Sequence, residues 1–253
     1  MLAASVSVPV TRAQAPAPAA ASEPGATPSG ASAVDPAAVQ ALKKMGDYLQ
    51  TLKRFAVSTD ATGERVLRDG QKLQHTARAE LQVVRPGMLR ARISSARSDR
   101  YLIFDGRTVT LYAPEQKYYS IVDFSGTIGE LIDRLEEKYG VELPMTDLFR
   151  WGTPAASLDN FESAMYAGQA RIGKDLCDHY AFRQGKIDWQ IWITAGEHPL
   201  PRKVAITNRG DEARPQSVSL FSWNLKSTFD DASFRFTPPS GAKRIEMVER
   251  KSR

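Results

Sequence analysis

Period-two alternation of apolar and polar residues is the feature that most limits what this chain can fold into. From residue 54 onward the sequence repeats short runs of this kind, such as "GMLRARISSA" and "RTVTLYAPE", which are separated by Gly, Asp and Pro turn residues. In the first run Leu89, Ala91 and Ile93 share one face of a strand, while Arg90 and Arg92 share the other. The pattern predicts a meander of short antiparallel strands that forms a strongly curved, half-open sheet.

Two stretches break this rhythm with helical spacing. The run "DPAAVQALKKMGDYLQTLKRF" opens with a capping Asp35 and with Pro36, and it predicts one amphipathic helix of about 18 residues. In mid-chain, "GTIGELIDRLEEKYG" predicts a second helix, and the apolar residues 145–151 predict a short third one. We therefore expect an α+β fold, mainly antiparallel β, with an N-terminal helix and a helical lid or plug.

The first 35 residues differ in composition from the rest of the chain. "LAASVSVPV" is mildly apolar, "AQA" at 13–15 resembles a small-residue cleavage site, and the following Ala/Pro-rich stretch cannot pack. We interpret residues 1–35 as a signal peptide and disordered tether whose start lies further upstream, since no basic residue precedes the apolar stretch. The alternative is a disordered leader on a cytoplasmic protein. Residues 36–250 are expected to form a single domain, soluble because no stretch reaches the roughly 18 apolar residues of a membrane span.

The charge of the chain excludes some partners. Its 253 residues carry a formal net charge of +5 with a pI near 9.3, but the basic residues are scattered rather than gathered in a stripe with aromatic side chains. A nucleic-acid partner is therefore not expected, whereas transient contact with an anionic membrane surface remains open.

The sequence contains no known metal-binding motif, no nucleophile elbow and no phosphate-binding loop. The best cluster is "DLCDH", in which Asp175, Cys177 and His179 share one face of a strand. Such a trio could hold a metal or pair a thiolate with an imidazole. However, same-face neighbours on a strand lie about 6.5–7 Å apart, which is too far for a direct hydrogen bond. We favour a packed cysteine beside a polar edge, and expect no catalytic set, cofactor or metal.

The run "FRFTPPSG" near the C-terminus has a specific meaning. Phe234 and Phe236 alternate on one face, and Pro238 and Pro239 then provide no N–H for a sheet ladder. Gly241 permits a sharp turn. The pattern predicts a last strand that closes a sheet edge and then leaves the sheet.

This ending resembles the FxFxPPxG strand of the periplasmic lipoprotein carriers of the LolA type. "VVRPGMLR" is similar to the RP segment of these carriers, and "FDGRTVTLYAPEQKYYSI" is similar to their DGxxxxxYxP hairpin. More narrowly, "CDHYAFRQGKIDWQIWITAGEHPLPRKVAIT" resembles the signature of a family of uncharacterised predicted periplasmic proteins related to the LolA/LolB-type carriers. The resemblance covers residues 36–247.

The resemblance implies a LolA-like half-barrel whose apolar concave face is capped by helices and holds acyl chains. It also implies that Arg85 helps to latch the lid to the barrel. With strand facing taken from alternation, the expected cavity lining is Leu89, Phe104, Leu111, Ile128, Leu131, Leu135, Met145, Leu148, Phe149 and Trp192.

Three functions remain open at this point. The leading hypothesis is a soluble periplasmic protein that binds a lipid or an acylated protein in an apolar cavity without transforming it. The second is an envelope stress sensor or protein interaction module that uses the same fold with an envelope protein partner. The third is a hydrolase or metalloenzyme built on Asp175, Cys177 and His179.

Overall fold

The computed structural model describes residues 33–249 apart from 142, 144 and 157, and the described residues belong to one compact unit. Within this part of the chain the helices are α1 (Pro36–Thr51), α2 (Ile128–Tyr139) and α3 (Asp147–Arg150), with a 3-10 turn η1 (Asp231–Phe234). The strands are β1 (Arg54–Val66), β2 (Lys72–Val84), β3 (Met88–Ser95), β4 (Ser98–Phe104), β5 (Thr108–Ala113), β6 (Tyr118–Asp123), β7 (Ser163–Ile172), β8 (Asp175–Gln184), β9 (Ile187–Thr194), β10 (Pro201–Asn208), β11 (Gln216–Asn224) and β12 (Lys243–Arg244). The expected signal peptide lies outside the described residues and stays a prediction.

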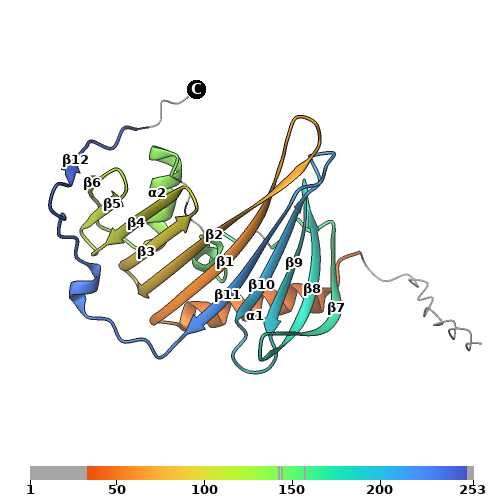
Figure 1. The fold of residues 1–253 in the computed structure, drawn as a ribbon. Coiled ribbons are helices and arrows are strands. Elements are labelled where there is room, and N and C mark those ends of the chain that lie inside the picture. Colours follow the sequence, from red (N-terminus) through yellow and green to blue (C-terminus); the bar gives the residue numbers. More distant parts are fainter. Residues whose placement is uncertain (1–32, 142, 144, 157, 250–253) are drawn as a thin grey trace, which may run out of the picture. The chain divides into compact units, whose positions relative to one another are not determined.

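The strands form one open sheet in the order β12-β6-β5-β4-β3-β2-β1-β11-β10-β9-β8-β7 (Figure 1). Neighbouring strands are antiparallel except for the parallel pair β12 and β6. Two meanders therefore lie side by side: β1–β6 runs outward from the centre, and β7–β11 runs inward from the opposite edge. The predicted mainly antiparallel, half-open fold is confirmed, and the sheet is not closed into a barrel.

This topology explains where the helices lie. The connection from β6 to β7 has to pass from one edge of the sheet to the other, and it contains α2 and α3. Helix α1 begins at the other edge, where Val34 bridges Ala164 of β7, and it leads into β1 at the centre. As a result α1 lies across β7–β11, while α2 lies beside β3–β5 (Figure 1).

Local chemistry fixes α1. The Asp35 side chain accepts a hydrogen bond of 2.8 Å from the Ala37 N–H, and Pro36 occupies the first turn, where no N–H is needed. A Cβ atom on Gly46 would lie only 2.5 Å from the backbone nitrogen of Gly152. Glycine therefore allows α1 to touch the segment after α3 backbone to backbone. The buried face of α1 consists of Ala38, Leu42, Met45, Gly46 and Leu49.

Helix α2 has a defined start and end. A capping box joins Thr127 and Glu130, because the Thr127 N–H donates to Glu130 Oε2 at 2.7 Å and the Glu130 N–H donates to Thr127 Oγ1 at 3.3 Å. Gly140 ends the helix with a left-handed φ of 64°. The Ile128 N–H also donates to the Pro86 carbonyl at 2.9 Å, which ties the start of α2 to the β2–β3 turn.

The main core lies between the helices and one face of the sheet, which we name the inner face. Two neighbouring rows of inner-face side chains cross β1–β5, namely Phe55, Val83, Leu89, Phe104 and Val109, and Val57, Leu81, Ala91, Leu102 and Leu111. The opposite, outer face carries a small separate cluster of Cys177, Trp192 and Ala205.

The run "FRFTPP" does not form the predicted last strand. Phe234 ends the 3-10 turn, and the chain then follows the outer face, with the Phe236 ring 5.3 Å from the Tyr112 ring. Pairing resumes only at β12, because Pro238 and Pro239 cannot donate ladder hydrogen bonds. The edge of β6 is therefore covered by β12 and not by "FRFTPP".

We name residues 235–249 the C-terminal strap. The strap begins on the outer face and passes the edge of β6 as β12. It ends on the inner face, where Met247 packs against the main core and the Glu249 carboxylate lies 2.7 Å from Nζ of Lys138 on α2. The strap thus lies against both faces of the part of the sheet formed by β3–β6.

Candidate functional site

A groove of about 610 Å³ on the inner face of β3–β6 is the leading candidate for a binding site. The sheet lines its floor with Ile93, Leu102, Leu111, Ala113 and Ser120. The cover consists of Val141 and Leu143 after α2 and of Ile245, Met247 and Val248 from the C-terminal strap. Aliphatic side chains make up the centre of floor and cover, while Arg100, Tyr118 and Glu246 also line the groove, so it suits an apolar ligand with a polar end.

The groove exists because α2 covers only part of the inner face. Leu131 and Leu135 pack toward Val109, and a pocket of only about 10 Å³ remains between them. Leu102 and Leu111 belong to the next row of the sheet and line the groove instead. Over Leu102 and Leu111 the cover comes from the strap and from Val141 and Leu143, and not from a helix.

The strap is held over the groove by short edge pairing. The Ile245 N–H donates to the Tyr119 carbonyl at 2.8 Å, and the Ile245 carbonyl accepts from the Ser120 hydroxyl at 2.6 Å. Val248 is 80% exposed and Ile245 is 48% exposed, although both line the groove. A segment with so little buried apolar surface opens at low cost compared with the core.

Arg85 lies where the resemblance expects a latch. Its Nη1 donates to Gln50 Oε1 on α1 at 3.2 Å, its Nη2 reaches the Leu148 carbonyl on α3 at 3.5 Å, and its guanidinium lies 5.4 Å from the Phe149 ring. Burial lowers the pKa of Arg85, and its Nε is buried without a hydrogen-bond partner among the described residues. Arg85 therefore joins the β2–β3 turn to α1 and α3. Its role as a latch stays a proposal.

The structure separates the predicted cavity residues into different environments. Leu111 lines the groove, and Met145 is partly buried against the main core. The buried members of the main core are Leu89, Phe104, Ile128, Leu131, Leu135, Leu148 and Phe149. These side chains fill the space between sheet and helices, and of the expected lining residues Leu111 borders the groove.

Trp192 lies on the outer face, on the opposite side of the sheet from the groove. Its ring stacks on His179 with centroids 4.0 Å apart, and Nζ of Lys203 lies 4.3 Å from it. Ile191 and Ile193 flank Trp192 in the sequence, and this apolar run gives no alternation from which to read the facing.

Most of the residues that line the groove were not predicted from the sequence. Ile93 could have been found, because it shares a strand face with Leu89 and Ala91. The strap residues Ile245 and Met247 carry no such signal, since they lie outside any long strand or helix.

The trio Asp175, Cys177 and His179 is already engaged with other groups. Asp175 lies 3.0 Å from Nε of Arg202, and His179 Nε2 lies 2.9 Å from Gln190 Oε1. Cys177 is fully buried, and desolvation raises the pKa of its thiol, which favours the unreactive protonated form. Within the described part of the chain, no group of three or more His, Cys, Asp and Glu side chains could hold a metal ion.

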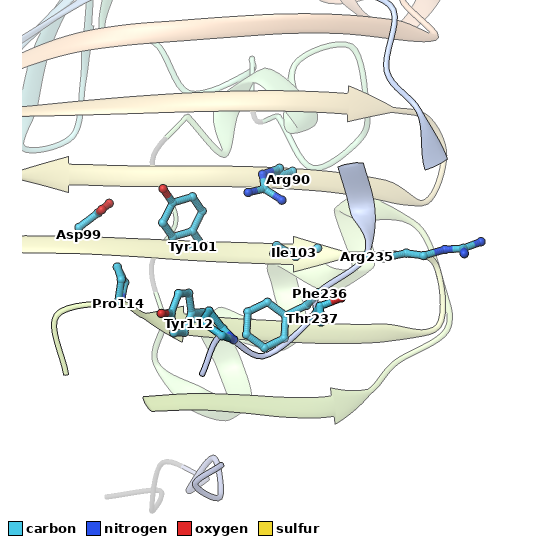
Figure 2. A pocket seen from close by; sticks show the side chains of 10 residues that line it. Arg90, Asp99, Tyr101, Ile103, Tyr112, Pro114, Arg235, Phe236 and Thr237 are labelled. Carbon is cyan, nitrogen blue, oxygen red and sulfur yellow. The ribbon is translucent and has the colours of Figure 1, made fainter. Parts of the chain in front are cut away.

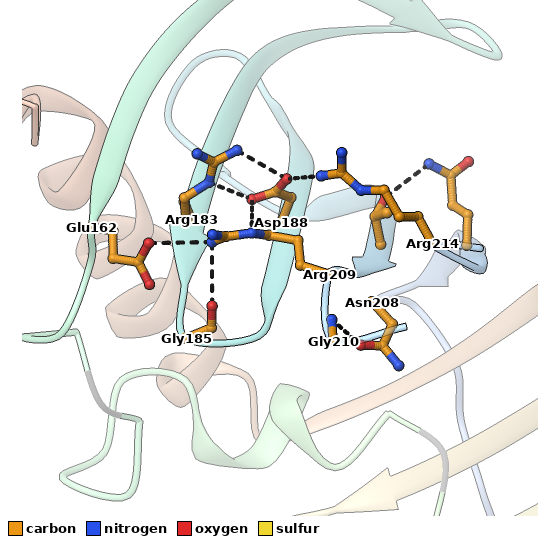
Figure 3. A network of polar contacts seen from close by, with 10 residues as sticks. Glu162, Arg183, Gly185, Asp188, Asn208, Arg209, Gly210 and Arg214 are labelled. Atoms are coloured by element: carbon orange, nitrogen blue, oxygen red, sulfur yellow. Dashed lines mark hydrogen bonds and ion pairs between the residues drawn. The ribbon is translucent and has the colours of Figure 1, made fainter. Parts of the chain in front are cut away.

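A smaller pocket and an ion-pair network belong to the other half of the sheet. The pocket of about 270 Å³ lies near α3, where Asp147 and Arg150 stand beside apolar side chains such as Phe161 and Trp189, and it has less than half the volume of the groove. In the network, drawn in Figure 3, Asp188 accepts from Arg183 at 2.7 Å and from Arg214 at 3.2 Å. The Arg183 hydrogen bond is the main reason why the pKa of Asp188 is lowered.

Several solved structures are distantly similar to this chain. LprF from Mycobacterium bovis is 12% identical, covers 83% of this chain and 99% of its own, and has a TM-score of 0.44. The Mycobacterium tuberculosis lipoprotein LppX is 12% identical over 78% of this chain and 100% of its own, with a TM-score of 0.40. A LolA superfamily protein from Nitrosomonas europaea is 11% identical over 79% and 97%, with a TM-score of 0.37. These likenesses are distant, and no ligand follows from them.

The family of the chain rests on its sequence. No curated protein matches it. Among the described residues, no helix is long and apolar enough to cross a membrane. The model of the DUF2092 family, described as a predicted periplasmic protein, matches residues 38–248, in agreement with the periplasmic location expected from the sequence. The chain therefore belongs to the DUF2092 family of predicted periplasmic proteins.

Proposed function

We propose that this protein binds a lipid, or an acylated partner, by taking an acyl chain into the inner-face groove and releasing it unchanged. The observation that carries the proposal is the groove of about 610 Å³ with an aliphatic floor and an aliphatic cover. This volume falls within the range of about 300–1,000 Å³ that is usual for small-molecule sites.

The chemistry of the lining favours a chain with a polar end. Each methylene removed from water contributes about 0.8 kcal/mol, so the aliphatic walls supply affinity without any specific contact. The Ser120 hydroxyl at the floor is already bonded to the strap. Charged Arg100 and Glu246 also line the groove, and both residues are exposed, so they provide polar surroundings for a headgroup in contact with water.

The family is described as periplasmic, and in that water-filled compartment an acyl chain needs a cover during transfer. The strap supplies this cover and is itself only lightly held. Reversible opening of the strap then gives access to the groove, and no covalent step is needed.

The test is native mass spectrometry of protein purified without detergent, followed by solvent extraction of anything bound. Uptake of a fluorescent fatty acid is then compared for the parent, for Leu111→Trp, which fills the groove, and for Leu220→Trp. The last is a matched control, because Leu220 is 44% exposed on β11 and does not line the groove.

We expect uptake by the parent and the control and a clear loss in Leu111→Trp. Leu143→Asp, at a partly buried position in the cover, provides a second groove variant, and circular dichroism checks that it folds. Equal uptake by the groove variants and the parent, or no uptake by the folded parent, would refute the proposal. A stoichiometric protein partner without lipid would favour the interaction-module hypothesis.

A further inference from the structure

A second pocket of about 280 Å³ lies on the outer face, against the strands that carry the groove on their inner face (Figure 2). Its sheet side is formed by Arg90 of β3, by Asp99 and Tyr101 of β4 and by Tyr112 of β5. The C-terminal strap forms the other wall with Phe236. The lining of this pocket differs from that of the groove, because it combines aromatic rings with charged groups.

The rings form a row along the pocket. The centroids of Tyr101 and Tyr112 are 6.3 Å apart, and those of Tyr112 and Phe236 are 5.3 Å apart, with tilts of 33° and 48°. Figure 2 shows the three rings side by side over the sheet. The face of an aromatic ring is electronegative, so it attracts groups with weakly positive C–H bonds, such as those on one face of a pyranose ring.

Fixed polar groups lie beside these rings. Arg92 forms a two-pronged ion pair with Asp99, with both N–O distances at 3.0 Å, and its guanidinium lies 5.4 Å from the Tyr101 ring. Arg90 lies 5.4 Å from the same ring and donates to the Ser233 carbonyl at 3.1 Å. A carboxylate with further lone pairs and a guanidinium with further N–H groups can bind neighbouring hydroxyls, which both donate and accept.

The charges argue against two other ligands. Arg92 is neutralised by Asp99, and Arg235 points away from the rings in Figure 2, so Arg90 remains as the main cation for an anionic group. An acyl chain would have to desolvate these ionised groups without replacing their hydrogen bonds.

We propose that this outer pocket is a saccharide-binding site in which a pyranose ring packs against the wall formed by Tyr112 and Phe236, beside Tyr101, and its hydroxyls bind Arg90 and Asp99. The volume of about 280 Å³ limits the site to a small ligand or one end of a longer one. The sugar can come from a free glycan or from the headgroup of a glycolipid. The site opens on the opposite face of the sheet from the groove, although Tyr101 and Tyr112 border both, and it does not require acyl-chain binding.

The test uses saturation-transfer NMR with maltose, cellobiose and N,N′-diacetylchitobiose. We expect transfer to the ring C–H protons of at least one disaccharide, and binding about tenfold weaker in Tyr112→Ala and Phe236→Ala, since each removes one stacking face. Tyr166→Ala is the matched control, because Tyr166 is 46% exposed on the distant strand β7. Tyr112→Leu keeps the bulk of the side chain if the alanine variant does not fold.

Two outcomes would overturn the proposal. One is the absence of transfer to all three disaccharides with folded parent protein, and the other is equal binding by the parent and both pocket variants. Phosphatidylcholine vesicles with and without a galactolipid separate the two sources of sugar, since only a headgroup ligand makes vesicle binding depend on the galactolipid. Leu111→Trp is expected to leave disaccharide binding unchanged, so the result does not depend on the lipid groove.

Discussion

The two meanders of the sheet share one strand pattern but differ in what covers their inner faces. In the packed half, α1 lies over β7–β11, the Phe182 and Trp189 rings stack with centroids 4.5 Å apart, and the tilted Phe161 ring lies 5.1 Å from Phe182, so that a pocket of about 270 Å³ near α3 remains. In the open half, α2 and the strap share the cover of β3–β6 and leave the groove. The comparison teaches that the cover, and not the alternation of the strands, decides where the sheet encloses open space.

The two halves are also held together by different kinds of interaction. The loops of the packed half meet in the network of Figure 3, where Arg209 lies 3.2 Å from Glu162 and 3.7 Å from Asp188. In the open half, the strap is held by the pairing of β12 with β6 and by the hydrogen bond from the Ser120 hydroxyl to the Ile245 carbonyl. We therefore expect motion in the open half and rigidity in the packed half.

The largest expected difference between the halves comes from truncating one inner-face side chain in each. Ile191 in the packed half is fully buried, so Ile191→Ala should lower the free energy of unfolding by about 2–5 kcal/mol. Leu111 borders the groove, and Leu111→Ala should cost less than about 2 kcal/mol, because less new cavity is created. Urea unfolding followed by circular dichroism measures both values. Equal losses would show that the groove is filled by protein in solution.

The Arg85 contacts give the next largest effect. Arg85→Leu removes the hydrogen bonds to Gln50 and Leu148, and we expect a loss of about 1–3 kcal/mol in stability. We also expect faster exchange of a bound fluorescent fatty acid, because Arg85 holds α3, and the segment that leads from α2 to α3 contributes Val141 and Leu143 to the cover of the groove. Arg107→Leu, at an exposed position in the β4–β5 turn, is the control. Unchanged exchange in Arg85→Leu would exclude a latch at this position.

The Asp188 network predicts a smaller, pH-dependent effect in the packed half. Because the folded state lowers the pKa of Asp188, its carboxylate stabilises the fold above the ordinary pKa and loses this contribution as the pH falls through the folded-state pKa. Asp188→Asn should therefore lower Tm at neutral pH, with a difference that shrinks below about pH 4. Asp47→Asn, an exposed carboxylate on α1, is the control. A Tm difference that stays constant across this range would contradict the assignment.

Cys177, on the outer face of the packed half, should show the smallest effect. Its burial and raised thiol pKa predict almost no reaction with iodoacetamide in the folded protein at neutral pH and complete reaction in urea. Mass spectrometry measures the labelled fraction. Rapid labelling of the folded protein would support the hydrolase hypothesis.

Much of the fold follows from local patterns. The Asp35–Pro36 start of α1, the Thr127–Glu130 capping box and the alternation around Leu89 each fix an element from neighbouring residues alone. The site was harder to predict. Arg85 was identified through a family resemblance. The side of the sheet on which Trp192 lies could not be predicted, because Trp192 belongs to a continuous apolar run.

The sequence by itself determined the elements of this protein, because caps, turns and period-two alternation act over a few residues. The tertiary structure alone decided which apolar residues fill the core and which line open space. Leu102 and Leu111 alternate in their strands as Phe104 and Val109 do, yet only the first two line the groove. The reason is that α2 packs over Val109 and does not reach Leu102 and Leu111. Part of the cover over these two residues comes from the strap, which follows more than 100 residues later in the chain.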